Sequence, residues 1–153
     1  MKNKLDQLDY DILTLISEDA QTPYTEVAKK LVISPGTVHA RMRKMKEMGL
    51  VLGATLNLDY AVMGWKFTVF LGIYLTESTF YKKVIQHLIE VKEVVKVHHV
   101  TGKYDVFIKM HAKDSIHYRD IYQNSILTIE GIKGVESFIS VEENLSRHID
   151  FPG

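Results

Sequence analysis

The chain has 153 residues, of which 46% are hydrophobic, and its 19 basic residues balance its 19 acidic residues. No apolar run approaches the ~20 residues of a membrane-spanning helix, and no secretory signal opens the chain. Cysteine is absent, which excludes disulfides and thiolate zinc sites. We therefore expect a cytoplasmic protein, and we expect any polyanionic partner to contact a local cluster of cations, because the chain as a whole carries no net charge.

Residues 5–48 have the hydrophobic spacing of helices. Asp6 is a candidate N-cap for the first helix, which carries several acids. Thr22-Pro23 is expected to open a second helix, and Ser34-Pro35 to open a third. In each case a hydroxyl residue precedes a proline, which suits the first helical position because its missing N–H is not needed there. The expected apolar stripes comprise Leu5, Leu8, Ile12, Leu15 and Ile16, then Val27, Ala28 and Leu31, then Val38, Met42 and Met45.

The third helix begins VISPGTVHARMRKMK and should end at Gly49. Its outward face starts with small residues and ends with cations, Lys44 included. A helix that enters the DNA major groove needs this order, because small residues allow close approach to bases while Lys and Arg reach phosphates. The short turn before it has helix-turn-helix spacing. The candidate DNA-binding residues are Ser34, Pro35, Gly36, Thr37, His39, Ala40, Arg41, Arg43 and Lys44.

A plainer interpretation is also open. Solvated cations are common on the outer face of amphipathic helices in three-helix cores. Arg41 is ambiguous, since it lies at the edge of the buried face and could pair with an acid of the first helix.

After Gly49 the hydrophobic period changes. Residues 51–58 could form a strand, and residues 57–64 have the composition of a connector. The rest predicts a βαββαβ order, which is the ferredoxin-like split unit. Its elements are expected at 66–76, 79–91, 94–101, 105–112, 115–129 and 135–142. The predicted fold class is α+β, with a winged helix-turn-helix domain at 1–52, a strand or linker at 53–65, and a ferredoxin-like sandwich at 66–153.

The predicted strands are apolar on both faces. In a two-layer ferredoxin-like unit the helices cover only one face of the sheet, so large apolar residues on the other face need a cover. A second copy of the chain is the simplest cover, and the alternative is that a few aromatic rings are exposed. The candidate dimer-interface residues are Phe70, Tyr74, Phe107 and Phe138.

A tight hairpin is predicted at Thr101-Gly102-Lys103-Tyr104-Asp105. Gly102 can adopt a positive φ and expose backbone N–H groups that suit an α-carboxylate. Asp105 could accept from an α-ammonium, so the loop offers both signs to a zwitterion. The alternative is an ordinary turn with a solvated Asp105. The seven histidines show no chelating spacing, and no nucleophile is paired with a base, so neither a metal site nor an enzyme is predicted.

The sequence resembles the Lrp/AsnC family of transcription regulators over essentially its whole length, with the asparagine-type members most similar. The resemblance rests on Leu8-Asp9, Ile12-Leu13, Tyr24, Glu26-Val27-Ala28, Ser34-Pro35-Gly36-Thr37-Val38-His39, Arg41, Met45, Met48-Gly49-Leu50-Val51, Gly53-Ala54, Gly64 and Thr101-Gly102-Lys103-Tyr104-Asp105. It implies an N-terminal DNA-binding domain and a C-terminal ligand-sensing domain. It also implies dimers that assemble further, often into octamers, with amino-acid effectors bound between dimers.

The expected function is therefore a sequence-specific DNA-binding regulator whose DNA affinity or assembly responds to a small amino acid. Its expected partners are double-stranded DNA, a free amino acid and further copies of the chain, and no cofactor is expected. The candidate effector residues are His99, Val100, Thr101, Gly102, Lys103, Tyr104 and Asp105, with asparagine as the first candidate ligand. The alternative is an amino-acid-binding or architectural oligomeric protein without effector-gated DNA regulation.

Overall fold

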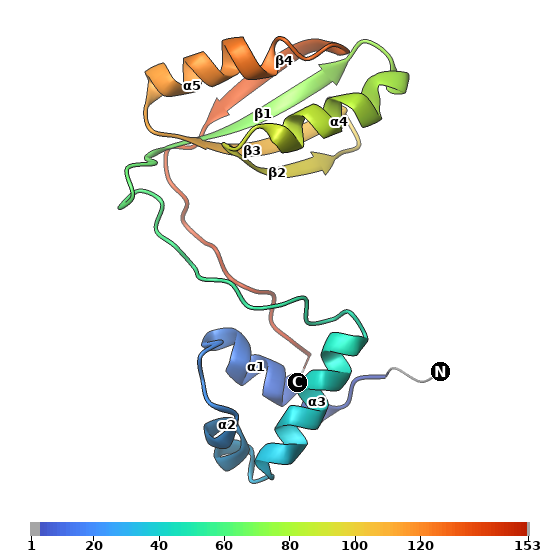
Figure 1. The fold of residues 1–153 in the computed structure, drawn as a ribbon, viewed down its shortest axis with the longest axis vertical. Coiled ribbons are helices and arrows are strands. Elements are labelled where there is room, and N and C mark those ends of the chain that lie inside the picture. The colour runs from blue at the N-terminus through green and yellow to red at the C-terminus, as the bar shows by residue number, and fades with distance from the viewer. Residues whose placement is uncertain (1–3, 153) are drawn as a thin grey trace. The chain divides into compact units, whose positions relative to one another are not determined.

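A computed structural model of the chain describes residues 4–152, which divide into two compact units. One unit runs to Asn57 and includes the residues from Leu145 onward, and the other is Leu58–Asn144 (Figure 1). The C-terminal segment thus groups with the first unit, whereas the sequence places it in the second domain. No helix within residues 4–152 is long and apolar enough to cross a bilayer.

The N-terminal unit is a bundle of three helices (Figure 1). They are α1 at Gln7–Glu18, α2 at Tyr24–Leu31 and α3 at Pro35–Glu47. The predicted apolar stripes meet in one core, because each helix turns its hydrophobic side inward. The buried members of this core are Ile12, Val27, Ala28, Val38, Met42 and Met45.

The predicted caps are confirmed for α1 and α3. Asp6 accepts from the backbone N–H of Asp9 at 3.0 Å, and Asp9 accepts from that of Asp6 at 3.1 Å, which makes a reciprocal capping box. Ser34 Oγ accepts from the N–H of Thr37 at 3.1 Å, with proline next in the first helical turn. The prediction for α2 is wrong in detail. The N-cap is Pro23, which has no side-chain cap bond.

The turn between α2 and α3 is tight because α2 ends in a left-handed residue. Val32 has φ of 56°, and the N–H of Ile33 reaches back to the carbonyl of Ala28 at 2.9 Å. This is the 6→1 bond of a Schellman-type helix end. A β-branched residue is unusual in this conformation, so the tight turn is formed at some cost in backbone strain.

The predicted strand at 51–58 is absent. These residues join no strand ladder, and Gly53 among them has a positive φ of 156°. A strand is defined by its pairing with a neighbour, and no other segment of residues 4–152 pairs with this one. The apolar pattern was therefore insufficient to predict regular structure here.

The C-terminal unit confirms the ferredoxin-like order. Its antiparallel sheet has the strand order β2-β3-β1-β4, and α4 and α5 cover one face (Figure 1). Both helices have irregular ends, a 3₁₀ turn before α4 and a π-helical stretch after α5. The elements are β1 at Phe67–Leu75, η1 at Ser78–Phe80, α4 at Tyr81–Glu90, β2 at Val94–His99, β3 at Val106–Ala112, α5 at Ser115–Ile121, η2 at Tyr122–Ile126 and β4 at Ile132–Ile139.

Strand β4 starts and ends three residues earlier than predicted. Gly131 precedes it with φ of 99°, and Phe80 packs so closely there that a Cβ on Gly131 would meet it at 2.5 Å. This tight corner brings Ile132 opposite Leu75 and so starts the β1–β4 ladder at once. The predicted helix over 115–129 also changes character at Tyr122, where the π-helical stretch begins.

The two faces of the sheet differ as the alternation predicts. The helix-covered face buries Val69, Leu71 and Ile73 completely. The other face carries a cluster of aromatic rings with centroids 5.2–6.2 Å apart. We call it the aromatic face, and it comprises Phe70, Tyr74, Tyr104, Phe107 and Phe138.

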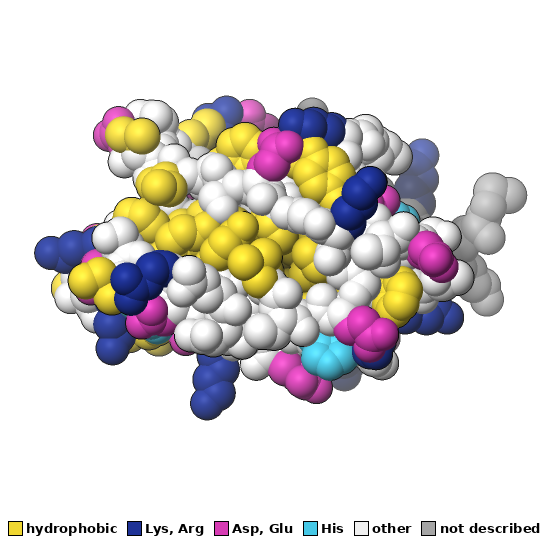
Figure 2. All heavy atoms as spheres, turned by 90° about the horizontal axis from the view of Figure 1, so that it is seen from above, with side chains coloured by type: hydrophobic (Ala, Val, Ile, Leu, Met, Phe, Trp, Pro, Cys, Tyr) yellow, Lys and Arg dark blue, Asp and Glu magenta, His cyan; other side chains and the backbone are white. Residues whose placement is uncertain are grey.

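Figure 2 shows the molecule from above, with hydrophobic side chains gathered near the middle of this view and charged side chains mainly toward its rim.

Gly72 makes room for one ring of the aromatic face. A Cβ at this position would lie 2.6 Å from two ring carbons of Tyr104, whereas a Cβ on Gly134 of the neighbouring strand would meet only Tyr74, at 3.7 Å. Tyr104 therefore lies flat against the backbone of β1 because residue 72 has no side chain.

This packing predicts unequal effects of two glycine substitutions. Gly72→Ala should lower the free energy of unfolding by about 1–3 kcal/mol, the usual cost of overpacking. Gly134→Ala, the matched control, should cost less, since its new methyl makes an ordinary contact. Urea denaturation followed by circular dichroism measures both. Equal effects of the two substitutions would contradict the proposed packing of Tyr104.

Candidate DNA-binding and effector sites

The outer face of α3 is exposed where the sequence places its small residues. Pro35, Gly36, His39 and Ala40 are exposed, and Thr37 is half-buried. No large side chain stands between this helix and an approaching partner at its N-terminal end, so backbone and short side chains could come close to base edges.

His39 is held by a residue that sequence reasoning missed. Its ring meets the ring of Tyr24 on α2 edge to face, with centroids 4.6 Å apart. Tyr24 was noted only as part of the family resemblance, and it precedes His39 by 15 positions in the sequence. Nothing in the local pattern indicates the pair, which forms only when α2 and α3 pack together.

Arg41 and Lys44 both pair with the start of α1. Arg41 donates to Asp6 and, at 3.1 Å, to Asp9, while Lys44 Nζ donates to Asp9 at 2.9 Å. The pairing that the sequence allows for Arg41 is thus present. For Lys44 the prediction of an outward side chain is wrong. At ~100° per residue it lies on the same flank of α3 as Arg41, and α1 packs against that flank.

Asp9 is the only charged residue that is fully buried within residues 4–152. Burial by itself would raise the pKa of this carboxyl, but hydrogen bonds from Lys44, from the backbone of Asp6 and from Arg41 outweigh it and lower the pKa. The pKa of Asp6 is also lowered, chiefly by its bond from Arg41. The four side chains therefore form a neutral set of two cations and two carboxylates.

Two other cations of α3 remain exposed. They are Arg43, which the sequence analysis includes among the DNA-binding candidates, and Lys46, which it leaves out. Neither makes an ion pair within residues 4–152. These two side chains therefore provide the positive charge that α3 presents to solvent.

The hairpin between β2 and β3 has the predicted backbone chemistry. Gly102 has φ of 108°, and within residues 4–152 the N–H groups of residues 101–104 donate to no backbone carbonyl. Just before the hairpin, the ring of His99 lies against that of Tyr81, with centroids 4.4 Å apart, and Val100 donates to the carbonyl of Asp105 at 3.3 Å. Unsatisfied N–H groups in a loop are suitable donors for a carboxylate.

Two hairpin side chains are bound to Glu136 of β4. Lys103 Nζ lies 2.7 Å from one oxygen of this carboxylate, Tyr104 donates to the other at 2.7 Å, and Tyr74 of β1 also donates at 2.7 Å. The bond from Lys103 contributes most to lowering the pKa of Glu136 to about 2. The hairpin is thereby joined to the aromatic face, a connection that the sequence pattern did not indicate.

Asp105 is already partly used inside the chain. Its Oδ2 accepts from the backbone N–H of Leu75 at 2.8 Å, at the end of β1. Asp105 remains exposed to solvent, and its side chain also helps to hold the hairpin against the sheet. Its other oxygen has no partner within residues 4–152, so one acceptor is available to a ligand.

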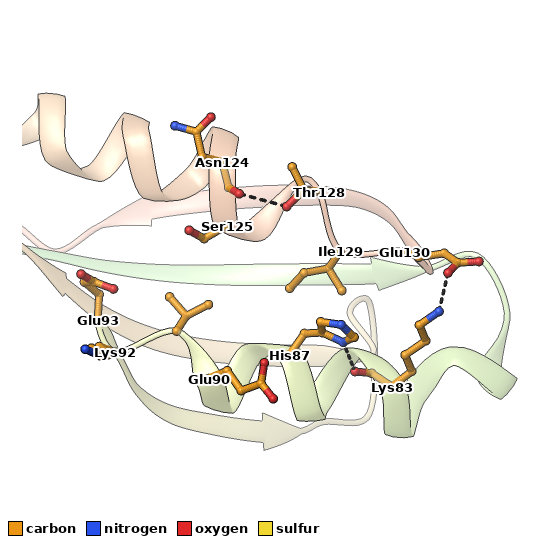
Figure 3. A pocket seen from close by; sticks show the side chains of 11 residues that line it. Lys83, His87, Glu90, Lys92, Glu93, Asn124, Ser125, Thr128, Ile129 and Glu130 are labelled. Carbon is orange, nitrogen blue, oxygen red and sulfur yellow. Dashed lines mark hydrogen bonds and ion pairs between the residues drawn. The ribbon is translucent and has the colours of Figure 1, made fainter.

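A groove of about 560 Å³ lies on the helical side of the unit, between α4 and η2 (Figure 3). The ion pair between Lys83 and Glu130 joins α4 to the turn between η2 and β4 at the groove. None of the hairpin residues lines it, and sequence reasoning did not find it because its walls come from α4, from η2 and from the segments that follow each of them. The lining is mostly polar and comprises Lys83, His87, Glu90, Val91, Lys92, Glu93, Asn124, Ser125, Thr128, Ile129 and Glu130.

The histidines do not gather. Within residues 4–152 no three His, Asp or Glu side chains lie together as metal ligands would. His111 bonds through Nδ1 to the hydroxyl of Thr68 at 3.0 Å and stacks on Tyr60, and burial lowers its pKa. The ring of His117 packs against Trp65. Both therefore have structural contacts in the C-terminal unit.

Comparisons with known proteins match both units of the chain. A family described as "Lrp/AsnC ligand binding domain" matches residues 68–148, and one described as "Winged helix-turn-helix DNA-binding" matches residues 5–51. Regulatory protein AsnC of Haemophilus influenzae is 34% identical over 147 residues, which is 96% of this chain and 98% of that protein.

Solved structures extend the likeness to the fold. The structure of Escherichia coli AsnC has a TM-score of 0.92 at 31% identity and covers 97% of this chain and 99% of its own. A transcriptional regulator of Neisseria meningitidis in complex with L-methionine has a TM-score of 0.91 at 17% identity, with 97% of each chain covered. At that identity the likeness is one of fold alone.

The two family matches together span both units. The relatives named above are regulators that match this chain over nearly their whole length. The predicted fold class is confirmed, and so is the prediction that the chain is not an enzyme. The chain belongs to the Lrp/AsnC family of DNA-binding transcription regulators.

Proposed function

We propose that α3 enters the major groove of DNA and that its N-terminal end reads the bases. The single observation that carries this proposal is the exposed face of α3, where small residues precede cations. Thr37 and His39 have side chains that can hydrogen-bond to base edges, and Tyr24 orients the ring of His39. The proposed surface comprises Ser34, Pro35, Gly36, Thr37, His39, Ala40, Arg43 and Lys46.

Ion pairs within the domain decide which cations of α3 we assign to phosphate contacts. Arg43 and Lys46 are exposed and unpaired within residues 4–152, so they can neutralise phosphates without breaking an internal bond. Arg41 and Lys44 are held by Asp6 and Asp9, and for this reason they are left out of the proposed surface. Since the proposed target is genomic DNA, the protein is expected to act in the cytoplasm.

The aromatic face is the proposed dimer interface. Phe70, Tyr74, Phe107 and Phe138 are joined through Tyr104 into a continuous cluster, and Phe138 is 43% exposed in the single chain. A face of this kind is the sort of patch that a second copy covers. A dimer would present two α3 helices to half-sites about 34 Å apart, and assembly of dimers into an octamer is the further state that we propose.

The hairpin is the proposed contact for an amino-acid effector. The free N–H groups of residues 101–104 suit the α-carboxylate, and the unpaired oxygen of Asp105 suits the α-ammonium. His99 and Val100 lead into the same loop. The loop is open in a single chain, so a ligand enclosed between two dimers would favour the assembly that completes its site. Asparagine is the first candidate.

The phosphate assignment predicts a change in the salt dependence of DNA binding. Arg43→Ala and Lys46→Ala should each lower the log–log salt slope by about 0.9 for each chain on the duplex. Lys82→Ala, an exposed change of the same charge on α4, serves as control and should leave the slope unaltered. Fluorescence anisotropy with a duplex selected by the wild-type protein measures the slopes. Wild-type slopes in both α3 variants would rule out this surface.

The dimer proposal predicts that a charge on the aromatic face prevents association. Phe138→Lys should give monomers at micromolar concentration, because dimerisation would bury an unpaired ammonium. Leu127→Lys is the matched control, since Leu127 is 47% exposed but follows η2, and it should remain dimeric. Sedimentation velocity distinguishes the species. A monomeric wild type, or a dimeric Phe138→Lys variant, would refute the proposed interface.

The effector proposal predicts that loss of the negative charge of Asp105 weakens amino-acid binding. Asp105→Asn should weaken amino-acid binding about 10- to 150-fold, because the ammonium loses a charged partner worth ~1.5–3 kcal/mol. Its amide oxygen can still accept from Leu75, so its unfolding midpoint should stay near that of the wild type, whereas Asp105→Ala should lose both functions.

Calorimetric titration of the wild type with each of the twenty amino acids, asparagine first, provides the measurement. Undiminished binding to Asp105→Asn would show that Asp105 is not the ammonium partner. If no amino acid binds the wild type at millimolar concentration, the effector proposal fails.

A further inference from the structure

We infer that Asp9 is a positioning residue of the DNA-binding domain, which sets the orientation of α3 and withholds the charge of Lys44 from DNA. This inference rests on the proposed DNA-binding surface and assigns a role to a residue outside it. Its basis is the set of bonds that we call the α1–α3 clamp, made by Asp6, Asp9, Arg41 and Lys44.

The clamp acts on α3 at two points. Arg41 and Lys44 lie three residues apart, nearly one helical turn, and each donates to a different oxygen of Asp9. Two bonds separated along the helix oppose both rotation of α3 about its axis and sliding along it. Asp9 is itself held in place by the capping box at the start of α1.

The apolar contacts of α3 define its orientation less sharply. Of its three buried residues, Met42 and Met45 are methionines, whose unbranched side chains adapt to small shifts of their neighbours. Buried polar contacts are directional, and the best-attested role of such groups is to select one register among similar packings. In this domain the clamp is the directional contact between α1 and α3.

The clamp also determines which cations are available to DNA. Lys44 is 36% exposed and its ammonium has further N–H donors, but Asp9 offsets its charge, so Lys44 could act on a phosphate as an unpaired cation only by leaving this fully buried carboxylate. Departure would leave this carboxylate with fewer partners, which is costly for a buried charge. Asp9 therefore keeps Lys44 out of the electrostatic, sequence-independent part of binding. The expected result is a higher ratio of specific to non-specific affinity.

A double-mutant cycle tests the inference with four full-length proteins: the wild type, Asp9→Asn, Lys44→Ala and the combination. Binding is measured against salt on a scrambled duplex and on a duplex selected by the wild type. Asp9→Asn should raise the log–log salt slope on the scrambled duplex by about 0.9 per bound chain, as Lys44 becomes free to meet a phosphate. It should also lower the selected-to-scrambled affinity ratio at least about fivefold, the loss expected when one base contact is misaligned.

Lys44→Ala gives the sharper comparison. In the wild-type background it should leave the slope unchanged, and in the Asp9→Asn background it should lower the slope by about 0.9 per chain. A purely structural role for Asp9 would reduce the folded fraction and hence the apparent affinity equally at all salt concentrations, without a change in slope. Circular dichroism reports the folded fraction of each variant.

Two results would overturn the inference. One is a fall in slope of similar size for Lys44→Ala in both backgrounds, which would place Lys44 on the DNA in the wild type. The other is a folded Asp9→Asn variant with wild-type slope and wild-type affinity ratio. If Asp9→Asn does not fold, Lys44→Ala in the wild-type background remains a test. A fall in its salt slope would overturn the inference, and an unchanged slope would support it. Failure of the proposed function is distinguishable, because it would appear as an unchanged slope for Arg43→Ala.

Discussion

The buried carboxylate of Asp9 imposes a constraint on the whole N-terminal unit, because a buried charge must be paired. Two cations of α3 meet this requirement, and the start of α1 supplies the remaining backbone bond. The same contacts hold α3 against α1 and divide its cations into paired and exposed ones. The shape and the charge of the DNA-binding face thus follow from one interaction.

A comparable arrangement joins the parts of the C-terminal unit. Glu136 accepts from Lys103 and Tyr104 of the hairpin and from Tyr74 of β1, while the ring of Tyr104 lies over Gly72. The loop proposed to bind the effector is therefore continuous with the face proposed to bind a second copy. A ligand that moved Tyr104 would alter that face directly, which gives a short physical route from effector binding to assembly.

The sequence predicted the features that depend on near neighbours. The caps at Asp6 and Ser34, the buried stripe of α3 and the hairpin at Gly102 follow from local chemistry and periodicity, and the structure has each of them. The aromatic face was also foreseen, because strand alternation places Phe70 and Tyr74 together. Resemblance to a known family added the assignment of a function, which periodicity alone does not supply.

Features that need tertiary contacts were missed or wrong. The helical wheel predicted that Lys44 points outward, because a wheel does not show where α1 packs against α3. Tyr24 and Glu136 acquire their roles only from residues distant in sequence. The segment 51–58 has an apolar strand-like pattern but no partner strand within residues 4–152, and pairing cannot be read from one segment.

Hydrogen–deuterium exchange of the full-length protein, followed by mass spectrometry, tests the central claim most directly. The claim is that DNA is bound by the exposed face of α3, while the hairpin of the C-terminal unit serves the effector. Addition of a selected duplex should slow exchange in peptides that cover residues 34–47, and a binding amino acid should slow exchange in peptides that cover residues 99–105. Protection by DNA that spares residues 34–47 and falls only on the C-terminal unit would contradict the account.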